Sequence, residues 1–274
     1  MTRSTVNPAS HYTAPRLFVA AELREGIDIM ASAAQAHYLG TVLRRGPGDV
    51  VRLFNGKAGE WLAHVGVSRR DRLSLTVADR LRAQAPEGGP WLVFALLKRD
   101  ATDIVVRQAV ELGASRILPV VTERTNAARV NAERLDAIAV EAAEQSERLT
   151  VPAIDPLARL DAVLAAWPAE RHLFAALERT WSEAGAATAR PHPQACPGLG
   201  NVTQARRHDA EGDGPRHAGT AALLVGPEGG FTPAEREMLR RFDFVTPISL
   251  GPLVLRAETA AAAGQALLLA MGWA

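Results

Sequence analysis

The hydrophobic positions of this chain follow two different periodic patterns, one in each part of the sequence. In the first 80 residues they form short runs of strand length, separated by tight turns. Asn55-Gly56 is a strong hairpin signal, and Ser32–Leu39 is the only plausible helix of this part. Several short strands in succession predict a small β-barrel. The predicted strands include Asp49–Phe54, Glu60–Val67 and Leu73–Ala78.

From Trp91 onward, buried strands alternate with amphipathic helices, which predicts a parallel α/β sheet. The predicted strands are Trp91–Leu97, Ile117–Val121, Leu173–Leu177, Ala221–Val225 and Phe244–Leu250. The predicted helices are Ala101–Leu112, Ala132–Leu149, Leu157–Ala166, one that begins after Thr232, and Ala257–Trp273.

A segment rich in turn-forming residues separates the two parts of the sequence. Residues 85–90 read Ala-Pro-Glu-Gly-Gly-Pro, so we predict one domain over residues 1–85 and a second over residues 86–274. Residues 183–218 interrupt the second domain with Gly, Pro, His and charged residues without apolar periodicity, and we interpret them as a flexible surface insertion. Their histidines lack ligand spacing, so we expect no metal site.

A glycine-rich loop follows the apolar run that ends at Val225. It reads Gly226-Pro227-Glu228-Gly229-Gly230-Phe231, and a helix start follows with Thr232 as N-cap, Pro233 at the first position and Glu235 closing a capping box. Such a loop brings backbone N–H groups close to a ligand. It lacks the lysine of a P-loop and the spacing of a dinucleotide fold, which excludes both of these nucleotide sites.

A second loop of the same kind begins about twenty residues later. The apolar run Phe244–Leu250 leads into Gly251-Pro252-Leu253-Val254-Leu255-Arg256-Ala257-Glu258-Thr259. Polar groups at the carboxyl end of a strand mark the edge at which open α/β sheets bind their ligands.

Together these two motifs resemble the RsmE family of RNA methyltransferases, within the SPOUT superfamily. Other segments are similar to the family over nearly the whole chain: Pro15–Ala20, His37–Arg44, Leu96–Asp100, Glu111–Thr125 and Glu141–Pro152. The resemblance implies an N-terminal PUA-like RNA-binding β-barrel and a C-terminal SPOUT α/β domain with a deep trefoil knot. Residues from about Glu183 to Ala218 fit no motif of the family.

The resemblance further implies that the knot holds S-adenosyl-L-methionine, with the adenine bound largely by backbone groups. The positions that would contact this cofactor are Leu224, Gly226, Pro227, Glu228, Gly229, Ile248, Leu250, Gly251, Leu255 and Thr259. Glu228 could equally accept hydrogen bonds from its own loop, and Thr259 and Glu258 could cap the last helix.

Arg256 is the candidate catalytic residue. A cation at the positive end of a helix is unfavourable unless it serves another purpose, although an ion pair with Glu258 is the simpler alternative. Uracil N3 must lose its proton before it attacks a methyl group. A guanidinium beside O2 or O4 would stabilise the developing anion, or Arg256 would hold the substrate phosphate.

Basic residues gather in the first domain. Residues 1–85 contain 12 Lys and Arg against 7 Asp and Glu, a net charge of +5, although the whole chain carries only +1. This excess indicates contact with RNA phosphates, and solvated strand ends remain the alternative. The candidate RNA-binding residues are Arg16, Arg44, Arg45, Arg69, Arg70 and Arg124.

The sequence therefore predicts an S-adenosylmethionine-dependent methyltransferase acting on N3 of a uridine in 16S ribosomal RNA of the small ribosomal subunit. The alternatives are methylation of another RNA position, such as a ribose 2′-hydroxyl, and a non-catalytic RNA-binding protein. We expect a homodimer that forms through the C-terminal domain. The single Cys196 excludes an internal disulfide, and the lack of a signal or membrane-spanning segment predicts a cytoplasmic location.

Overall fold

The computed structural model describes residues 13–66, 73–126, 129–177 and 221–273. The expected insertion at 183–218, like Arg69 and Arg70, lies outside these ranges. The chain divides into two compact units. The first contains the chain up to Glu87 together with Ala143–Val151, and the second contains Gly88–Ala142 and the chain from Pro152. Residues 143–151 therefore pack with the N-terminal unit, although the sequence analysis assigned them to the second domain.

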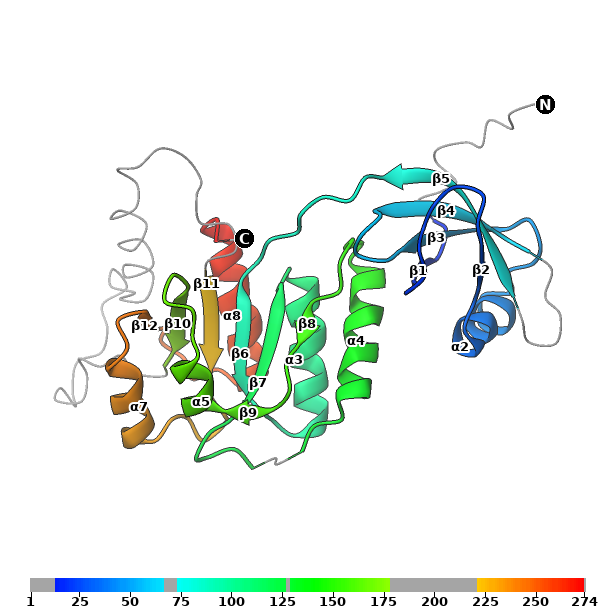
Figure 1. Cartoon of the computed structure of the whole chain (residues 1–274). Helices are drawn as coiled ribbons and strands as arrows, with labels where there is room; N and C mark the ends of the chain where they lie inside the picture. Colours follow the sequence, from blue (N-terminus) through cyan, green and yellow to red (C-terminus); the bar gives the residue numbers. More distant parts are fainter. Residues whose placement is uncertain (1–12, 67–72, 127–128, 178–220, 274) are drawn as a thin grey trace, which may run out of the picture. The chain divides into compact units, whose positions relative to one another are not determined.

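The first unit is built around one five-stranded sheet of order β1-β3-β4-β5-β2 (Figure 1). Its strands are β1 (Arg16–Phe18), β2 (Asp28–Met30), β3 (Val50–Phe54), β4 (Glu60–Val65) and β5 (Ser74–Arg82). Strand β1 runs parallel to β3, and the other pairs are antiparallel. The predicted Asn-Gly hairpin joins β3 to β4, where the side chain of Asn55 accepts hydrogen bonds from the N–H groups of Lys57 and Ala58.

The predicted helix of this unit is present and continues further than expected. Helix α2 (Ala33–His37) begins with a capping box between Ser32 and Gln35, and a π-helical turn over Tyr38–Val42 follows it directly. Its residue Leu39 is fully buried against the sheet, which fixes this turn to the core. The π-turn is a departure from helical periodicity that a hydrophobic pattern does not reveal.

A buried carboxylate organises the arginines of the first unit. Glu60 is only 2% exposed, and its oxygens accept hydrogen bonds from Nε of Arg16 at 2.5 Å and from Nε of Arg82 at 2.8 Å. Arg52 approaches the same carboxylate at 3.9 Å. A buried charge is tolerated when charged and hydrogen-bonding partners surround it, so Glu60 and these arginines depend on one another.

Arg16 also binds the segment 143–151. Its two terminal nitrogens donate to the backbone carbonyls of Ala143, Glu144 and Arg148, at 2.6–2.8 Å. Ala143 and Glu144 lie in the last turn of the helix Ala132–Gln145, and Arg148 follows shortly after it. The helix dipole favours a cation at this end. Burial lowers the pKa of the Arg16 guanidinium, and the bond to Glu60 opposes this shift.

The second unit contains a parallel sheet of order β12-β10-β11-β6-β7-β8, with β9 also paired to β7. Its strands are β6 (Trp91–Ala95), β7 (Arg116–Val121), β8 (Ala153–Ile154), β9 (Ala158–Arg159), β10 (His172–Ala176), β11 (Ala221–Val225) and β12 (Val245–Ile248). Its helices are α3 (Arg99–Glu111), α4 (Ala132–Gln145), α5 (Leu160–Ala165), α7 (Pro233–Arg240) and α8 (Ala257–Ala270). The five predicted strands and the five predicted helices are present, although β8 and β9 were not predicted and β9 lies in the range expected to begin a helix.

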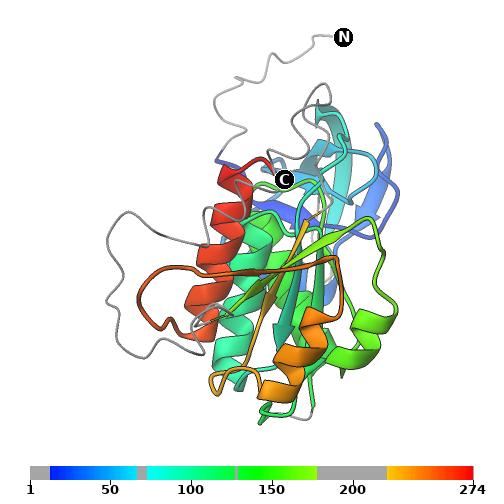
Figure 2. The same ribbon diagram turned by 90° about the vertical axis from the view of Figure 1, so that its left-hand side faces the viewer.

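Helices cover both faces of this sheet (Figures 1 and 2). On one face, α5 and α7 pack on Leu224 and its neighbours through Leu160, Leu164 and Leu239. On the other, α8 contacts α3, β6 and β11. Gly264 of α8 lies so close to Leu223 that a Cβ would meet the Leu223 side chain at 2.6 Å, and this close approach explains the glycine. Because both faces are covered, the strands are continuously apolar rather than alternating.

The register of the neighbouring strands β12, β10 and β11 brings three strand ends to one level. Ala176 at the end of β10 lies opposite Val225 at the end of β11 and opposite Ile248 at the end of β12. The loops that follow β11 and β12 therefore begin at the same edge, the carboxyl edge, on either side of β10.

We expect Glu60→Gln to lower the free energy of unfolding of the first unit by about 3–5 kcal/mol, because Arg16 would keep a buried charge without compensation. Hydrogen exchange of the β3 and β4 amides measures this local stability. Glu22→Gln is the control, because Glu22 and Arg24 form an exposed pair with a separation of 3.9 Å that should contribute little. Equal protection of these amides in both variants would contradict the role of Glu60.

Candidate active site

The glycine loop after β11 is a tight turn in the structure. The N–H of Gly230 donates to the carbonyl of Pro227 at 2.8 Å, which closes a turn over residues 227–230. Gly230 has a φ of 64°, a left-handed conformation that glycine adopts without strain. Strand β11 is fully buried up to Leu224, so the loop is anchored on the core of the second unit.

Glu235 fastens this loop at its far end. Helix α7 has the predicted capping box, in which Thr232 accepts from the N–H of Glu235, and one carboxylate oxygen of Glu235 accepts from the N–H of Thr232 at 2.8 Å. The other oxygen accepts from the N–H of Glu123 at 2.8 Å. This second bond joins the glycine loop to the loop after β7, a contact that the capping pattern did not predict.

Arg124 makes a further connection between these two loops. Its side chain donates to the carbonyl of Gly229 at 2.7 Å, and its stem packs against the position where a Cβ of Gly229 would lie. The sequence analysis assigned Arg124 to RNA contact. The structure gives it a role in holding the glycine loop, and the bond itself lies in an exposed position.

The second loop connects β12 to α8 and carries two exposed apolar residues. Leu253 is 77% exposed and Val254 is 73% exposed. Gly251 has a φ of 126°, which only glycine adopts readily, and the hydroxyl of Ser249 accepts a hydrogen bond from its N–H at 3.4 Å. The loop therefore turns sharply after β12 and presents Leu253 and Val254 to solvent.

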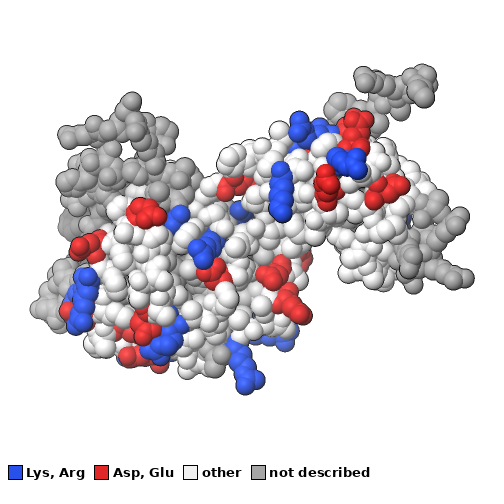
Figure 3. All heavy atoms as spheres, in the orientation of Figure 1, with Lys and Arg blue, Asp and Glu red and all other residues white. Residues whose placement is uncertain are grey.

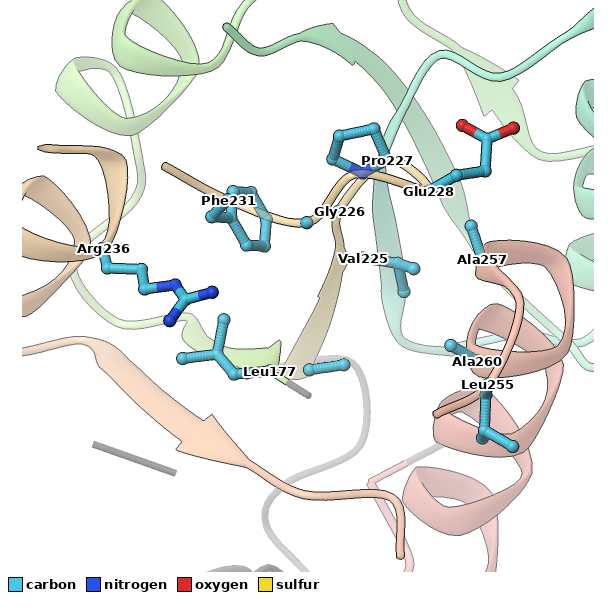
Figure 4. A pocket seen from close by; sticks show the side chains of 12 residues that line it. Leu177, Val225, Gly226, Pro227, Glu228, Phe231, Arg236, Leu255, Ala257 and Ala260 are labelled. Carbon is cyan, nitrogen blue, oxygen red and sulfur yellow. The ribbon is translucent and has the colours of Figure 1, made fainter. Parts of the chain in front are cut away.

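The two loops and the end of β10 enclose a cavity at the carboxyl edge of the sheet (Figure 4). Its wall is mainly apolar side chains and glycine backbone, with two charged residues. The lining residues are Ala176, Leu177, Val225, Gly226, Pro227, Glu228, Gly230, Phe231, Arg236, Leu255, Ala257 and Ala260. A cavity of this kind, with few charged groups, suits a largely neutral ligand whose orientation is set by those groups.

Four of the ten predicted cofactor positions line this cavity: Gly226, Pro227, Glu228 and Leu255. Leu224 is fully buried in the core, and Val225, the next residue, lines the cavity in its place. Strand alternation is the reason, since successive side chains point to opposite faces.

The other predicted cofactor positions lie beside the cavity. Ile248 is also fully buried, and its carbonyl accepts from the N–H of Leu177 at 3.0 Å. Three of them lie in the two loops but do not line the cavity: Gly229, Leu250 and Gly251. The exposed Thr259 lies on α8 and does not line the cavity either.

Arg256 lies at the rim of the cavity rather than in its wall. It is the N-cap residue of α8, its side chain is exposed, and the flanking residues Leu255 and Ala257 line the cavity. Within the described part of the chain, Arg256 forms no ion pair with Glu258, so the simpler alternative for this arginine is not observed. The N-cap of α8 is Arg256, whose side chain makes no capping hydrogen bond, and the side chains of Glu258 and Thr259 make no hydrogen bond within the described part of the chain.

The predicted RNA-binding residues of the first unit separate into two groups. Arg16 is buried and donates to Glu60 and to three carbonyls, so its assignment as an RNA contact is wrong. Arg44 is exposed, with a left-handed φ of 52°. Arg45 is half-buried, and its Nε has no hydrogen-bond partner among the described residues. Arg44 and Arg45 follow the π-turn, which also exposes Tyr38 and Val42.

Eight of the twelve lining residues were not among the predicted cofactor positions, and Phe231 and Arg236 have the largest side chains of these. Phe231 was noted only as part of the glycine motif, and its buried ring packs against Gly226, where a Cβ would meet the ring at 2.9 Å. Arg236 was not singled out at all, because an arginine on an amphipathic helix has the pattern of a surface residue. Its position, one turn after the N-cap Thr232, is the signal that could have identified it.

The described residues contain no group of three His, Cys, Asp or Glu side chains that could hold a metal ion. Across the same residues, no helix is both long enough and apolar enough to cross a membrane.

Family models and relatives agree with the two units. A model described as an RNA methyltransferase domain matches residues 89–269, and one described as an RNA methyltransferase PUA domain matches residues 32–78. Ribosomal RNA small subunit methyltransferase E of Rickettsia conorii is 31% identical, over 90% of this chain and 91% of the relative. The protein of the same name from Synechocystis is 31% identical, over 92% of this chain and 76% of the relative.

Solved structures resemble the whole described fold. Ribosomal RNA small subunit methyltransferase E of Neisseria gonorrhoeae, bound to S-adenosyl methionine, superposes with a TM-score of 0.73 at 25% identity. A putative methyltransferase of Legionella pneumophila in complex with the same cofactor gives the same TM-score and identity. Each comparison covers 94% of this chain and 98% of the other.

We expect Gly226→Ala to weaken binding of S-adenosylhomocysteine about tenfold or more. The new Cβ would lie 2.9 Å from the Phe231 ring, and relief of such overpacking costs about 1–3 kcal/mol. Calorimetric titration measures the affinity. Gly40→Ala is the control, since a Cβ there meets nothing within 4 Å. An unchanged affinity in Gly226→Ala would mean that the ligand binds elsewhere.

Proposed function

The chain belongs to the RNA methyltransferase family that includes ribosomal RNA small subunit methyltransferase E, and from this premise we propose its reaction. It transfers a methyl group from S-adenosyl-L-methionine to N3 of a uridine in the 16S RNA of the small ribosomal subunit. The observation that carries this proposal is the position of Arg256 between two residues that line the cavity. This arginine is exposed, and it has no ion-pair partner among the described residues.

The cavity fits the cofactor chemically. Adenosine is neutral and flat, and the wall offers apolar side chains together with the backbone of the glycine loop. Gly226 and Gly230 bring this backbone close to a ligand without interfering side chains. When bound, S-adenosylmethionine supplies an electrophilic methyl group on a sulfonium.

Arg256 has the role of stabilising negative charge on the uracil. As the N3 proton passes to solvent, charge develops on O2 and O4, and a guanidinium donor in the correct position stabilises it. The N3–methyl bond then forms as the bond between the methyl group and the sulfonium breaks, and S-adenosylhomocysteine is released. The planar fork of arginine matches adjacent oxygen acceptors better than an ammonium does. The helix start at Ala257 fixes the backbone of Arg256, which has an extended conformation.

The first unit supplies the RNA-binding surface in this proposal. Arg44 and Arg45 neutralise phosphates, and the exposed ring of Tyr38 offers a face on which an unpaired base can stack. Arg124, exposed beside Gly229, is the proposed contact on the second unit. The left-handed backbone of Arg44 is consistent with a functional position, since strained residues are frequent at such sites.

The proposed fold of the second unit includes a deep trefoil knot, formed where the last strand, loop and helix pass through an earlier loop. The strand order supports it. Strand β12 follows β11 in sequence but pairs with β10, after which the chain returns to α8 beside β6 and β11. This return encloses the cavity from both sides of β10.

We expect Arg256→Ala to slow single-turnover methylation of 30S subunits about a hundredfold to a thousandfold, the usual effect of losing one well-placed donor. Binding of S-adenosylhomocysteine should remain, because Leu255 and Ala257, and not the Arg256 side chain, line the cavity. Arg256→Lys should restore little of the rate.

Mass spectrometry of the digested RNA identifies the product of this reaction. A 3-methyluridine supports the proposal, whereas a 2′-O-methyl nucleoside would assign the chain to another RNA position. Absence of any methylation by the wild-type protein, despite RNA binding, would indicate a non-catalytic RNA-binding protein. A wild-type rate in Arg256→Ala would remove the catalytic role from Arg256.

A homodimer through the second unit is part of the proposal. The exposed Leu253 and Val254, beside the small residues at the start of α8, form an apolar surface that a second copy would cover. Light scattering at micromolar concentration should give twice the mass of the chain, and Val254→Glu should shift it toward the monomer. A monomeric wild-type protein would refute this part of the proposal.

A further inference from the structure

Arg236 places a positive charge in the otherwise apolar part of the cavity. It lies on α7, one turn after the N-cap Thr232, and its side chain extends toward Leu177 and Gly226 (Figure 4). Its Nε is buried and has no hydrogen-bond partner among the described residues. Phe231, Val225 and Leu177 supply the apolar surface around it.

The nearby acidic groups do not compensate this charge. Both oxygens of Glu235 accept backbone N–H groups, and Glu237 pairs with Arg240. Glu228 also lines the cavity, but its carboxylate is exposed and points away from Arg236 (Figure 4). A buried nitrogen of a guanidinium without a partner is costly, and such a group in a native protein calls for an explanation.

We propose that Arg236 is a specificity-determining residue, whose guanidinium binds the carboxylate of the methionine part of the cofactor. This inference rests on the proposed function. The carboxylate is the only anionic group of S-adenosylmethionine, and the arginine fork is suited to bind it through two parallel hydrogen bonds. Adenine and ribose are neutral and match the remainder of the wall, which is apolar side chain and backbone apart from the exposed Glu228.

The assignment gives the cavity two functionally different ends. The glycine loop and Leu255 hold the adenosine, whereas Arg236 recognises the amino-acid tail and anchors it when the ligand binds. Arg236 therefore discriminates ligands that carry this tail from nucleosides that lack it. Its position on α7, which Glu235 ties to the loop after β7, keeps this charge on a rigid element.

A pair of ligands tests this discrimination without any need for catalysis. S-adenosylhomocysteine carries the carboxylate, and 5′-methylthioadenosine retains the adenosine and sulfur but has no amino-acid tail. In calorimetric titrations of the full chain, we expect Arg236→Met to weaken S-adenosylhomocysteine binding about tenfold to a hundredfold, the usual effect of losing hydrogen bonds to a charged group. Its affinity for 5′-methylthioadenosine should stay unchanged.

Arg241→Met is the matched control, because Arg241 is exposed at the C-cap of the same helix, away from the cavity wall. It should bind both ligands as the wild type does. Arg236→Lys, which retains the charge and the long stem, should lose less affinity for S-adenosylhomocysteine than Arg236→Met. It serves as the test variant if Arg236→Met does not fold.

The outcomes separate this inference from the proposed function. An equal loss of both ligands in Arg236→Met would overturn it, since the arginine would then contact the nucleoside or support the loop. Unchanged affinities for both ligands would overturn it as well. If the wild-type protein bound neither ligand, the proposed function would fail first. Wild-type binding with a loss limited to S-adenosylhomocysteine supports both.

Discussion

The parallel pairing of β10 with both β11 and β12 is the constraint on which the site depends. Because Ala176 lies opposite Val225 on one side and Ile248 on the other, the two glycine-containing loops leave the sheet at one level. A register shift of one residue would turn the buried Leu224 toward the opposite face and displace Val225 from the cavity wall. Helices on both faces of the sheet fix this register, and the cavity forms between the loops as a result.

Hydrogen bonds then hold the glycine loop in one shape before any ligand binds. The two carboxylate oxygens of Glu235 accept backbone N–H groups of two different loops, the glycine loop and the loop after β7. Arg124, in the loop after β7, donates to the carbonyl of Gly229. Neither residue is in the cavity wall. The wall itself consists of apolar side chains, glycine backbone, the exposed Glu228 and the guanidinium of Arg236, which points inward. This combination suits a nucleoside with a charged tail.

In the first unit, the net charge overstates the number of basic side chains that can contact RNA. Arg16, Arg52 and Arg82 contribute to the excess of +5 in residues 1–85, but they surround the buried Glu60, and Arg52 also binds Glu147 at 2.9 Å. The hydrogen bond from Arg52 holds the pKa of the Glu147 carboxyl below its usual value. Charge counting cannot distinguish an arginine that serves a buried carboxylate from one that faces solvent, such as Arg44. This is why the assignment of Arg16 to RNA was wrong.

The sequence alone determined the features that local chemistry controls. Periodicity predicted the helices of the second unit and its strands other than the two-residue strands β8 and β9. Thr232 and Glu235 predicted the start of α7, and the two glycine motifs identified the loops of the site and the family. Tertiary structure decided the features that depend on distant partners. These are the packing of residues 143–151 with the first unit and the burial of Arg16. They also include the presence of Val225 rather than Leu224 in the cavity wall, and the inward position of Arg236. Each of these is fixed by contacts between segments far apart in the chain, and local periodicity carries no information about them.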